Sequence, residues 1–125
     1  MFGTHLELSI ARKLQVSKGQ RMRLIDAPDG FTIGIEPAYE RTSDAILFFA
    51  RDSKSVLTRG RVVFDAAKRD ELAWIAYPKA GKLDTDLNRD RLRELAGKFG
   101  VNSVGLVSLD DTWSAMRFRP RELPS

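Results

Sequence analysis

The segment from residue 45 to 50, Ala-Ile-Leu-Phe-Phe-Ala, is the feature that most constrains the fold. Six apolar residues stand in a row between Asp44 and Arg51. A strand with one face in water alternates apolar and polar residues, so an unbroken run of this length indicates a strand buried on both faces, as in parallel sheets. Residues 71–77, halted by Pro78, have the same character. Two buried strands of an α/β sheet are therefore predicted.

Two amphipathic helices are predicted after these strands. The first is capped by Asp52 or Ser53 and turns these residues inward: Val56, Leu57, Val63, Phe64 and Ala67. Gly60 lies inside it and weakens it by about 1 kcal/mol relative to alanine, so a break there is an alternative. The second is capped by Thr85 or Asp86, ends at Gly100, and has an inner face of Leu92, Leu95, Ala96 and Phe99.

A further strand over residues 101–109 completes a strand-helix-strand-helix-strand series, which is typical of βαβ units. Residues 114–118 are predicted to form a last, antiparallel strand. The expected fold is one Rossmann-like, three-layer α/β domain over residues 1–125, with a mostly parallel sheet and an antiparallel C-terminal edge strand. Residues 119–125, which contain two prolines, are expected to be a frayed tail.

The N-terminal part is less regular. A helix capped by Thr4 is expected to carry Leu6, Ile10, Ala11 and Leu14 inward and to end near Val16. Residues 22–25 form the first strand, in which flanking Arg21 and Arg23 indicate that one face is only partly covered. Residues 31–36 have a period of two and end at Pro37, followed by a polar linker over residues 38–43. The first crossover is therefore degenerate or replaced by a hairpin through residues 28–30.

Composition excludes several classes of site. The chain has no cysteine, so disulfides, thiolate metal sites and cysteine nucleophiles are excluded. His5 is the only histidine, too few for a histidine metal cluster or a Ser-His-Asp triad, and is expected to be a surface or interhelical residue rather than a catalytic base. The first residues do not resemble a secretory signal, and no apolar run approaches the roughly 20 residues of a membrane span. A cytoplasmic location without membrane contact is expected.

The net charge of +4 is spread over the chain rather than concentrated. The densest clusters are two Arg-x-Arg-x-Arg segments, at residues 89–93 and 117–121. On a helix successive arginines at this spacing lie about 200° apart, whereas on a strand they share one face. A solvated surface is favoured over a nucleic-acid interface.

Ligands of open parallel sheets bind beyond the carboxyl ends of the strands. This rule brings together the loops at residues 26–31, 77–86 and 110–113, with Trp113 or Tyr77 as a stacking surface and Lys79 as an anion contact. The candidate ligand-binding residues are Asp26, Asp29, Tyr77, Lys79, Thr85, Asp110 and Trp113. Each also has a structural explanation, since Asp29 before Gly30 suits a turn and Thr85 suits a helix cap.

Cofactor motifs are missing from these loops. Neither Gly-x-Gly-x-x-Gly after the first strand nor Gly-x-x-x-x-Gly-Lys-Ser/Thr occurs, and Pro28 removes one amide that a pyrophosphate would need. The adjacent pair Asp110 and Asp111 is a weak metal signal, because neighbouring carboxylates seldom converge on one ion. No cofactor and no metal are expected.

Several segments carry a family resemblance. They are Ser-Lys-Gly-Gln-Arg at 17–21, Leu-Ile-Asp-Ala-Pro-Asp-Gly-Phe at 24–31, Asp-Ala-Ile-Leu-Phe-Phe at 44–49, Trp-Ile-Ala-Tyr-Pro-Lys at 74–79, Thr-Asp-Leu at 85–87 and Asp-Asp-Thr-Trp-Ser-Ala-Met-Arg-Phe at 110–118. In this order the chain resembles the bacterial "domain of unknown function 3052" family over residues 11–119. The resemblance implies a degenerate class I methyltransferase-like core without the S-adenosylmethionine loop, and no assigned activity. The extended character of residues 31–36 departs from the family, in which a helix follows.

The sequence therefore favours a non-catalytic ligand-binding or regulatory module over an enzyme. A small polar or anionic ligand and a homo-oligomer are the partners considered. The alternative is an enzyme for a small polar substrate, with Asp26 or Asp110 as base and Lys79 as electrostatic stabiliser. A nucleic-acid-binding module is the least favoured hypothesis.

Overall fold

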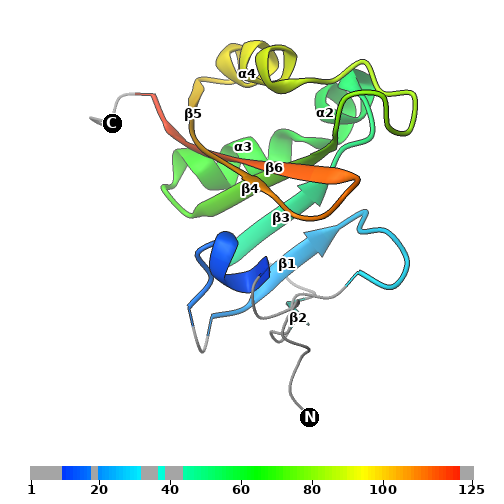
Figure 1. The fold of residues 1–125 in the computed structure, drawn as a ribbon. Coiled ribbons are helices and arrows are strands. Elements are labelled where there is room, and N and C mark those ends of the chain that lie inside the picture. The colour runs from blue at the N-terminus through cyan, green and yellow to red at the C-terminus, as the bar shows by residue number, and fades with distance from the viewer. Residues whose placement is uncertain (1–9, 18–19, 32–36, 39–43, 122–125) are drawn as a thin grey trace.

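The computed structural model describes residues 10–17, 20–31, 37–38 and 44–121, and in these one mixed sheet runs through the molecule (Figure 1). Its strand order is β2-β1-β3-β4-β6-β5. The strands are β1 (Met22–Ile25), β2 (Pro37–Ala38), β3 (Ala45–Phe49), β4 (Leu72–Pro78), β5 (Val101–Ser108) and β6 (Trp113–Pro120). The pairs β1–β2, β1–β3 and β3–β4 are parallel, while β6 is antiparallel to β4 and β5. The predicted α/β class with a mostly parallel sheet is confirmed.

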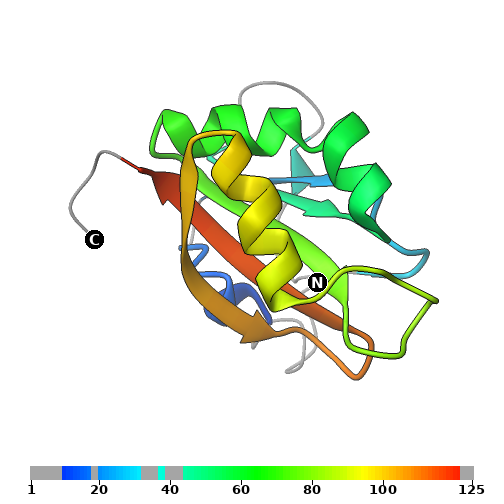
Figure 2. The same cartoon turned by 90° about the horizontal axis from the view of Figure 1, so that it is seen from above.

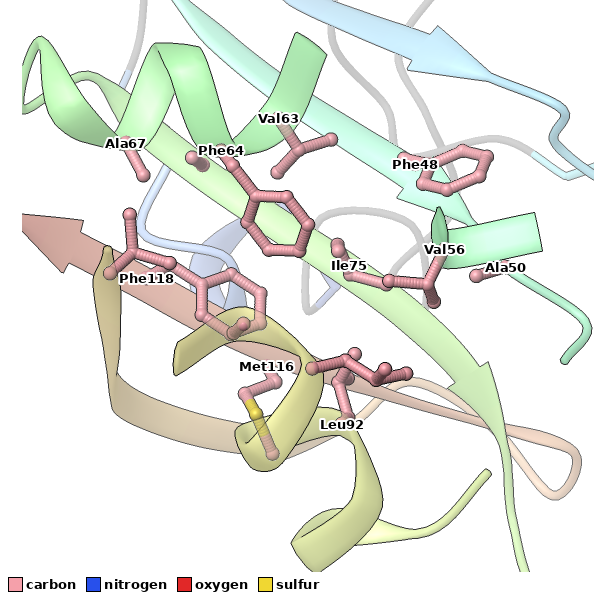
Figure 3. Close-up of a cluster of buried hydrophobic side chains, with 14 of the residues drawn as sticks. Phe48, Ala50, Val56, Val63, Phe64, Ala67, Ile75, Leu92, Met116 and Phe118 are labelled. Carbon is pink, nitrogen blue, oxygen red and sulfur yellow. The ribbon is translucent and has the colours of Figure 1, made fainter. Parts of the chain in front are cut away.

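Three helices cover one face of the sheet: α2 (Ser53–Arg59), α3 (Arg61–Lys68) and α4 (Arg89–Lys98) (Figure 2). Phe64 of α3 lies at the centre of this layer, where it stacks on Phe99 at 4.6 Å and meets Phe118 edge-on at 5.6 Å between ring centroids. Figure 3 shows Phe64 and Phe118 packed between α3 and the strands, with Met116 and Leu92 beside α4. This cluster holds the helices on the sheet.

The other face is covered by the opening helix, of which residues 10–13 are described. Ile10 and Leu14 pack against Trp74 and Phe49. The indole Nε1 of Trp74 donates a hydrogen bond of 3.0 Å to the carbonyl oxygen of Leu14, which ties the end of the opening helix to β4. Both faces of β3 are thereby buried, as its unbroken apolar run predicted.

The predicted antiparallel C-terminal edge strand is wrong in position. β6 is antiparallel, but it lies between β4 and β5, so that β5 forms the edge. The burial of the two strands gives the reason: Ala115 of β6 is buried on one face and Met116 and Phe118 on the other, whereas every second residue along β5 is exposed. The more apolar strand takes the interior place. Arg119 and Pro120 belong to β6 rather than to a frayed tail, and residues 122–125 lie outside the described part.

The helix boundaries confirm two expectations and correct two others. The break at Gly60 is real and separates α2 from α3, and Leu57, expected inside, is 49% exposed. Asp52 caps α2, with its carboxylate accepting from the amide of Ser55 at 2.8 Å. α4 is capped by Asn88 rather than by Thr85 or Asp86, since the Asn88 side chain accepts from the amide of Arg91 at 2.8 Å.

The chain that leaves β1 returns to form β2, which is parallel to β1. Pro37, expected to end a strand, instead begins β2 and pairs with Met22 of β1 in parallel. A tight hairpin would have returned antiparallel, so the chain has crossed over by residue 37. The strand expected over residues 31–36 lies outside the described residues except for Phe31, which belongs to no strand, and residues 39–43 of the expected linker, Thr4, His5 and Leu6 also lie outside them.

Candidate functional site

Two of the three predicted loops meet at the carboxyl edge of the sheet. Pro78 of β4 pairs with Trp113 of β6, and the amide of Lys79 donates to the carbonyl oxygen of Thr112 at 2.7 Å. The third loop, residues 26–31, follows β1 and is separated from β4 by the whole of β3. The three loops predicted from the carboxyl-end rule therefore lie at one edge of the sheet, but they do not form one pocket.

The polar groups of the β5–β6 turn are engaged in structural bonds. One carboxylate oxygen of Asp110 accepts from the amides of Thr112 and Trp113 at 2.8 and 2.7 Å. This is the geometry of an Asx turn, in which an aspartate closes its own loop. The Nζ of Lys79 donates to Oγ of Ser108 at 2.7 Å, so that the proposed anion contact braces the same turn.

Tyr77 and Trp113 do not form a stacking surface. The Trp113 ring packs edge-on against Phe49 at 5.0 Å and belongs to the cluster under the opening helix. Tyr77 belongs to the cluster under α2, α3 and α4, on the opposite face of the sheet. Burial raises the pKa of the Tyr77 phenol, partly opposed by the positive charges of Arg89 and Arg93. Both rings are core residues, only 5–6% exposed.

The other candidates also have structural partners or turn roles. Asp26 forms an ion pair with Arg59 of α2, at 2.7 and 3.0 Å. Asp29 is exposed in the turn before Gly30, whose φ of 80° needs glycine. Oγ1 of Thr85 accepts from the amide of Leu87 at 3.0 Å. None of the seven candidates is among the residues that line the groove described below.

The loops predicted from the sequence as candidate sites did not include the loop after β3. The backbone amide of the buried Ser53 donates a hydrogen bond to the carboxylate of Asp86 at 2.8 Å. Its hydroxyl oxygen accepts a hydrogen bond from Nε of Arg91 at 3.4 Å. This joins α2, the segment before α4 and α4 itself at the strand end. The same carboxyl-end rule applied to residues 50–53 would have included Ser53.

Asp52 and Asp86 have lowered pKa values at this junction. The amide and hydroxyl of Ser55 lower the pKa of Asp52 below its usual 3.8, and the amide and hydroxyl of Ser53 do the same for Asp86. A carboxylate with a lowered pKa adds stability that is fully present above its unfolded-state pKa and is lost as pH falls through the folded value.

Stability is therefore expected to fall as the pH drops below about 4, the ordinary carboxyl pKa. The double variant Asp52→Asn and Asp86→Asn keeps the acceptor oxygens but loses the titration. Denaturant unfolding across pH 2–5 should show a shallower fall for this variant than for the wild type. Asp111→Asn, at an exposed carboxylate, is the control and should keep the wild-type slope. Equal slopes for wild type and double variant would contradict the prediction.

The described residues do contain a groove, on the helix-covered face beside α3. Its volume is about 590 Å³, and its lining consists of Arg23, Ile46, Arg61, Val62, Asp65, Ala66, Arg69 and Glu71. Arg23 of β1 lies beside Ile46 of β3 in register, and α3 forms the opposite wall. The groove exists because α3 packs over β3 and β4 and leaves the neighbouring face of β1 beside it.

The charges in the groove are unevenly matched. Glu71 is held by Arg69 at 2.7 Å, while Asp65 has only a long contact of 3.9 Å to Arg61. The half-buried Arg23 side chain makes no hydrogen bond or ion pair in the described part of the chain. In the sequence, the alternation of Arg21 and Arg23 with apolar residues indicated the location of the groove, since it predicted that one face of β1 is only partly covered.

No group of three or more metal-ligating side chains occurs in the described ranges, and no helix within them is long and apolar enough to cross a membrane. Comparison of the chain with protein-family models, with curated proteins and with solved structures finds no match.

Proposed function

We propose that this protein is a non-catalytic binding module that takes a small anionic ligand in the groove beside α3. The observation that carries the proposal is the half-buried Arg23 guanidinium, which lines the groove and has no side-chain partner among the described residues. Leaving a buried or partly buried charge without a partner costs free energy. An anion that pairs with the Arg23 guanidinium therefore binds favourably, because the chain itself supplies no such partner.

The lining also indicates the shape of the ligand. Ile46, Val62 and Ala66 give the groove apolar walls, and its volume falls in the range of about 300–1,000 Å³ typical of small-molecule sites. A carboxylate or phosphate on an apolar or aromatic body fits both features. Arg61, whose only described contact is the long one to Asp65, supplies a second cation at the rim.

The enzyme alternative has less support. Of its two proposed bases, Asp26 forms an ion pair with Arg59 and Asp110 accepts hydrogen bonds from two loop amides. Its proposed stabiliser, Lys79, donates a hydrogen bond to the Ser108 hydroxyl. A nucleic-acid interface is also less favoured, because Arg59, Arg69, Arg91 and Arg119 are each matched by a carboxylate. In finer detail we propose a Rossmann-like, methyltransferase-related sheet, as the resemblance to the "domain of unknown function 3052" family implies.

A thermal-shift screen tests the proposal. Ligands that carry a carboxylate or phosphate on an apolar body are expected to raise the melting temperature on the order of 10 °C at 100 times their Kd. Arg23→Met should remove this shift, because it keeps the length of the side chain without its charge. Arg51→Met, at an exposed arginine after β3, is the matched control and should keep it.

Two results would contradict the proposal. One is a ligand shift that survives Arg23→Met unchanged, which would place the binding site elsewhere. The other is stabilisation by S-adenosylmethionine in both variants, since binding of that cofactor would show that the loop after β1 works without its glycines.

A further inference from the structure

We infer that the ligand of the groove is an α-amino acid with an apolar side chain, which places its carboxylate against Arg23 and its ammonium group against Asp65. The inference rests on the proposed function, which requires only an anion at Arg23, and adds a second contact. The groove is lined by residues of β1, β3, α3 and the segment that follows α3. Charges of both signs are therefore available to one ligand.

Asp65 is the acid of the groove that lacks a close partner. Its only ion pair in the described part of the chain is with Arg61, one turn earlier on α3, at 3.9 Å, which is beyond hydrogen-bond distance. The Arg61 side chain is 83% exposed and the Asp65 side chain 48%, so water screens the arginine charge while the carboxylate is half-buried. The carboxylate of Asp65 thus keeps its hydrogen-bonding capacity for a ligand.

The other acid of the groove is already matched. Arg69, one turn after Asp65, directs Nε and Nη2 to the two carboxylate oxygens of Glu71, at 2.7 and 3.2 Å. Hydrogen bonding to Glu71, more than the charge of Asp65, raises the pKa of the Arg69 guanidinium. Such bidentate pairs are among the strongest hydrogen-bonded contacts of side chains, so Arg69 belongs to Glu71 and leaves Asp65 to the ligand.

Arg23 and Asp65 carry opposite charges on facing walls of the groove. Arg23 belongs to β1 and Asp65 to α3, and the two side chains form no ion pair with each other in the described residues. Each half-buried charge is thereby left for an opposite charge on the ligand. A molecule with a carboxylate and an ammonium group satisfies both and adds no net charge to the groove. An α-amino acid carries these two groups on one carbon at neutral pH.

The apolar lining favours an apolar side chain on that carbon. Val62 and Ala66 are four residues apart and form one row along α3, beside the row that contains Asp65. Ile46 lies on β3, next to Arg23 in the parallel register. A phosphate ester fits less well, because it carries a charge of about −1.5 to −2 at pH 7 and the two acids of the groove would repel it.

Paired ligands test the ammonium contact. L-phenylalanine and L-leucine differ from 3-phenylpropanoate and 4-methylpentanoate only by the ammonium group. We expect each amino acid to bind the wild type at least about tenfold more tightly than its deamino analogue, since a hydrogen bond between charged groups is worth more than one between neutral groups. NMR titration at low salt measures the dissociation constants.

Asp65→Asn should abolish this preference, because it keeps the size of the side chain but removes its charge. The amino acids should bind at least about tenfold more weakly, while the deamino analogues bind as before. Arg23→Met should weaken both kinds of ligand alike. Asp111→Asn, at an exposed carboxylate of the β5–β6 turn, is the matched control and should keep the wild-type preference.

The possible results separate this inference from the proposed function. Deamino analogues that bind the wild type as tightly as the amino acids do would overturn the inference and leave the anion site in place, and this comparison needs no variant. The inference also fails if Asp65→Asn keeps the preference while its circular dichroism is unchanged. Binding of neither kind of ligand, or amino-acid binding that survives Arg23→Met, would overturn both.

Discussion

Phe64→Ala is expected to lower the free energy of unfolding by about 3–5 kcal/mol, the range for removing a fully buried phenylalanine. Phe64 is 0% exposed and contacts the rings of both Phe99 and Phe118. It joins α3 to the end of α4 and to the buried strand β6, so the cavity would open where three elements meet. Because these elements are held by the sheet, they cannot easily collapse to fill it.

Denaturant unfolding at a single pH measures this effect. Leu57→Ala provides the control, since it removes an apolar side chain from the adjoining helix at a position that is 49% exposed. Surface changes of this kind usually stay within about 0.5 kcal/mol. A Phe64→Ala variant whose unfolding free energy falls by no more than that of Leu57→Ala would show that the packing around α3 is not as described.

Gly60→Ala is expected to lower the free energy of unfolding by about 1–3 kcal/mol, as a group forced into a packed site does. Helix propensity alone predicts the opposite sign, a gain of about 1 kcal/mol. The structure decides between them. A Cβ on Gly60 would stand 2.5 Å from the backbone carbonyl oxygen of Val56 and 3.3 Å from the Phe64 ring. Neither is a flexible chain end, so the junction between α2 and α3 would have to move.

Gly97→Ala is the matched control for this change. Gly97 lies inside α4, where a Cβ would meet only the Arg121 guanidinium at 3.6 Å, an ordinary contact. Propensity then acts alone, and this variant is expected to gain about 0.5–1 kcal/mol. Thermal or denaturant unfolding of both variants gives the two signs. Stabilisation by Gly60→Ala would mean that α2 and α3 behave as one continuous helix.

Short-range patterns were sufficient for most elements of this fold. The unbroken apolar run at 45–50 predicted a strand buried on both faces, and the periodicity of Leu92, Leu95 and Ala96 predicted the inner face of α4. They failed where a nearby residue competed for the same role. Thr85, Asp86 and Asn88 all suit a helix N-cap, and only the path of the chain makes Asn88 the one that bonds to an α4 amide.

The candidate site was less predictable than the fold. The carboxyl-end rule collected loops that lie at one edge of the sheet, but it could not tell that alternate positions place Tyr77 and Trp113 on opposite faces. It also could not tell that Asp110 closes its own turn. The groove beside α3 depends on Arg23, Ile46 and Arg61, which come from three separate elements, and only their assembly creates the hollow.

The sequence by itself determined the α/β class, the buried central strands, and the absence of thiol chemistry and of the glycine-rich cofactor loop, because each depends on residue type or on local periodicity. The tertiary structure alone decided the place of β6 inside the sheet and of β5 at its edge. That choice depends on how much apolar surface each strand buries against α3, α4 and the opening helix. Such burial is a property of the whole assembled sheet, and no short segment of the chain contains it.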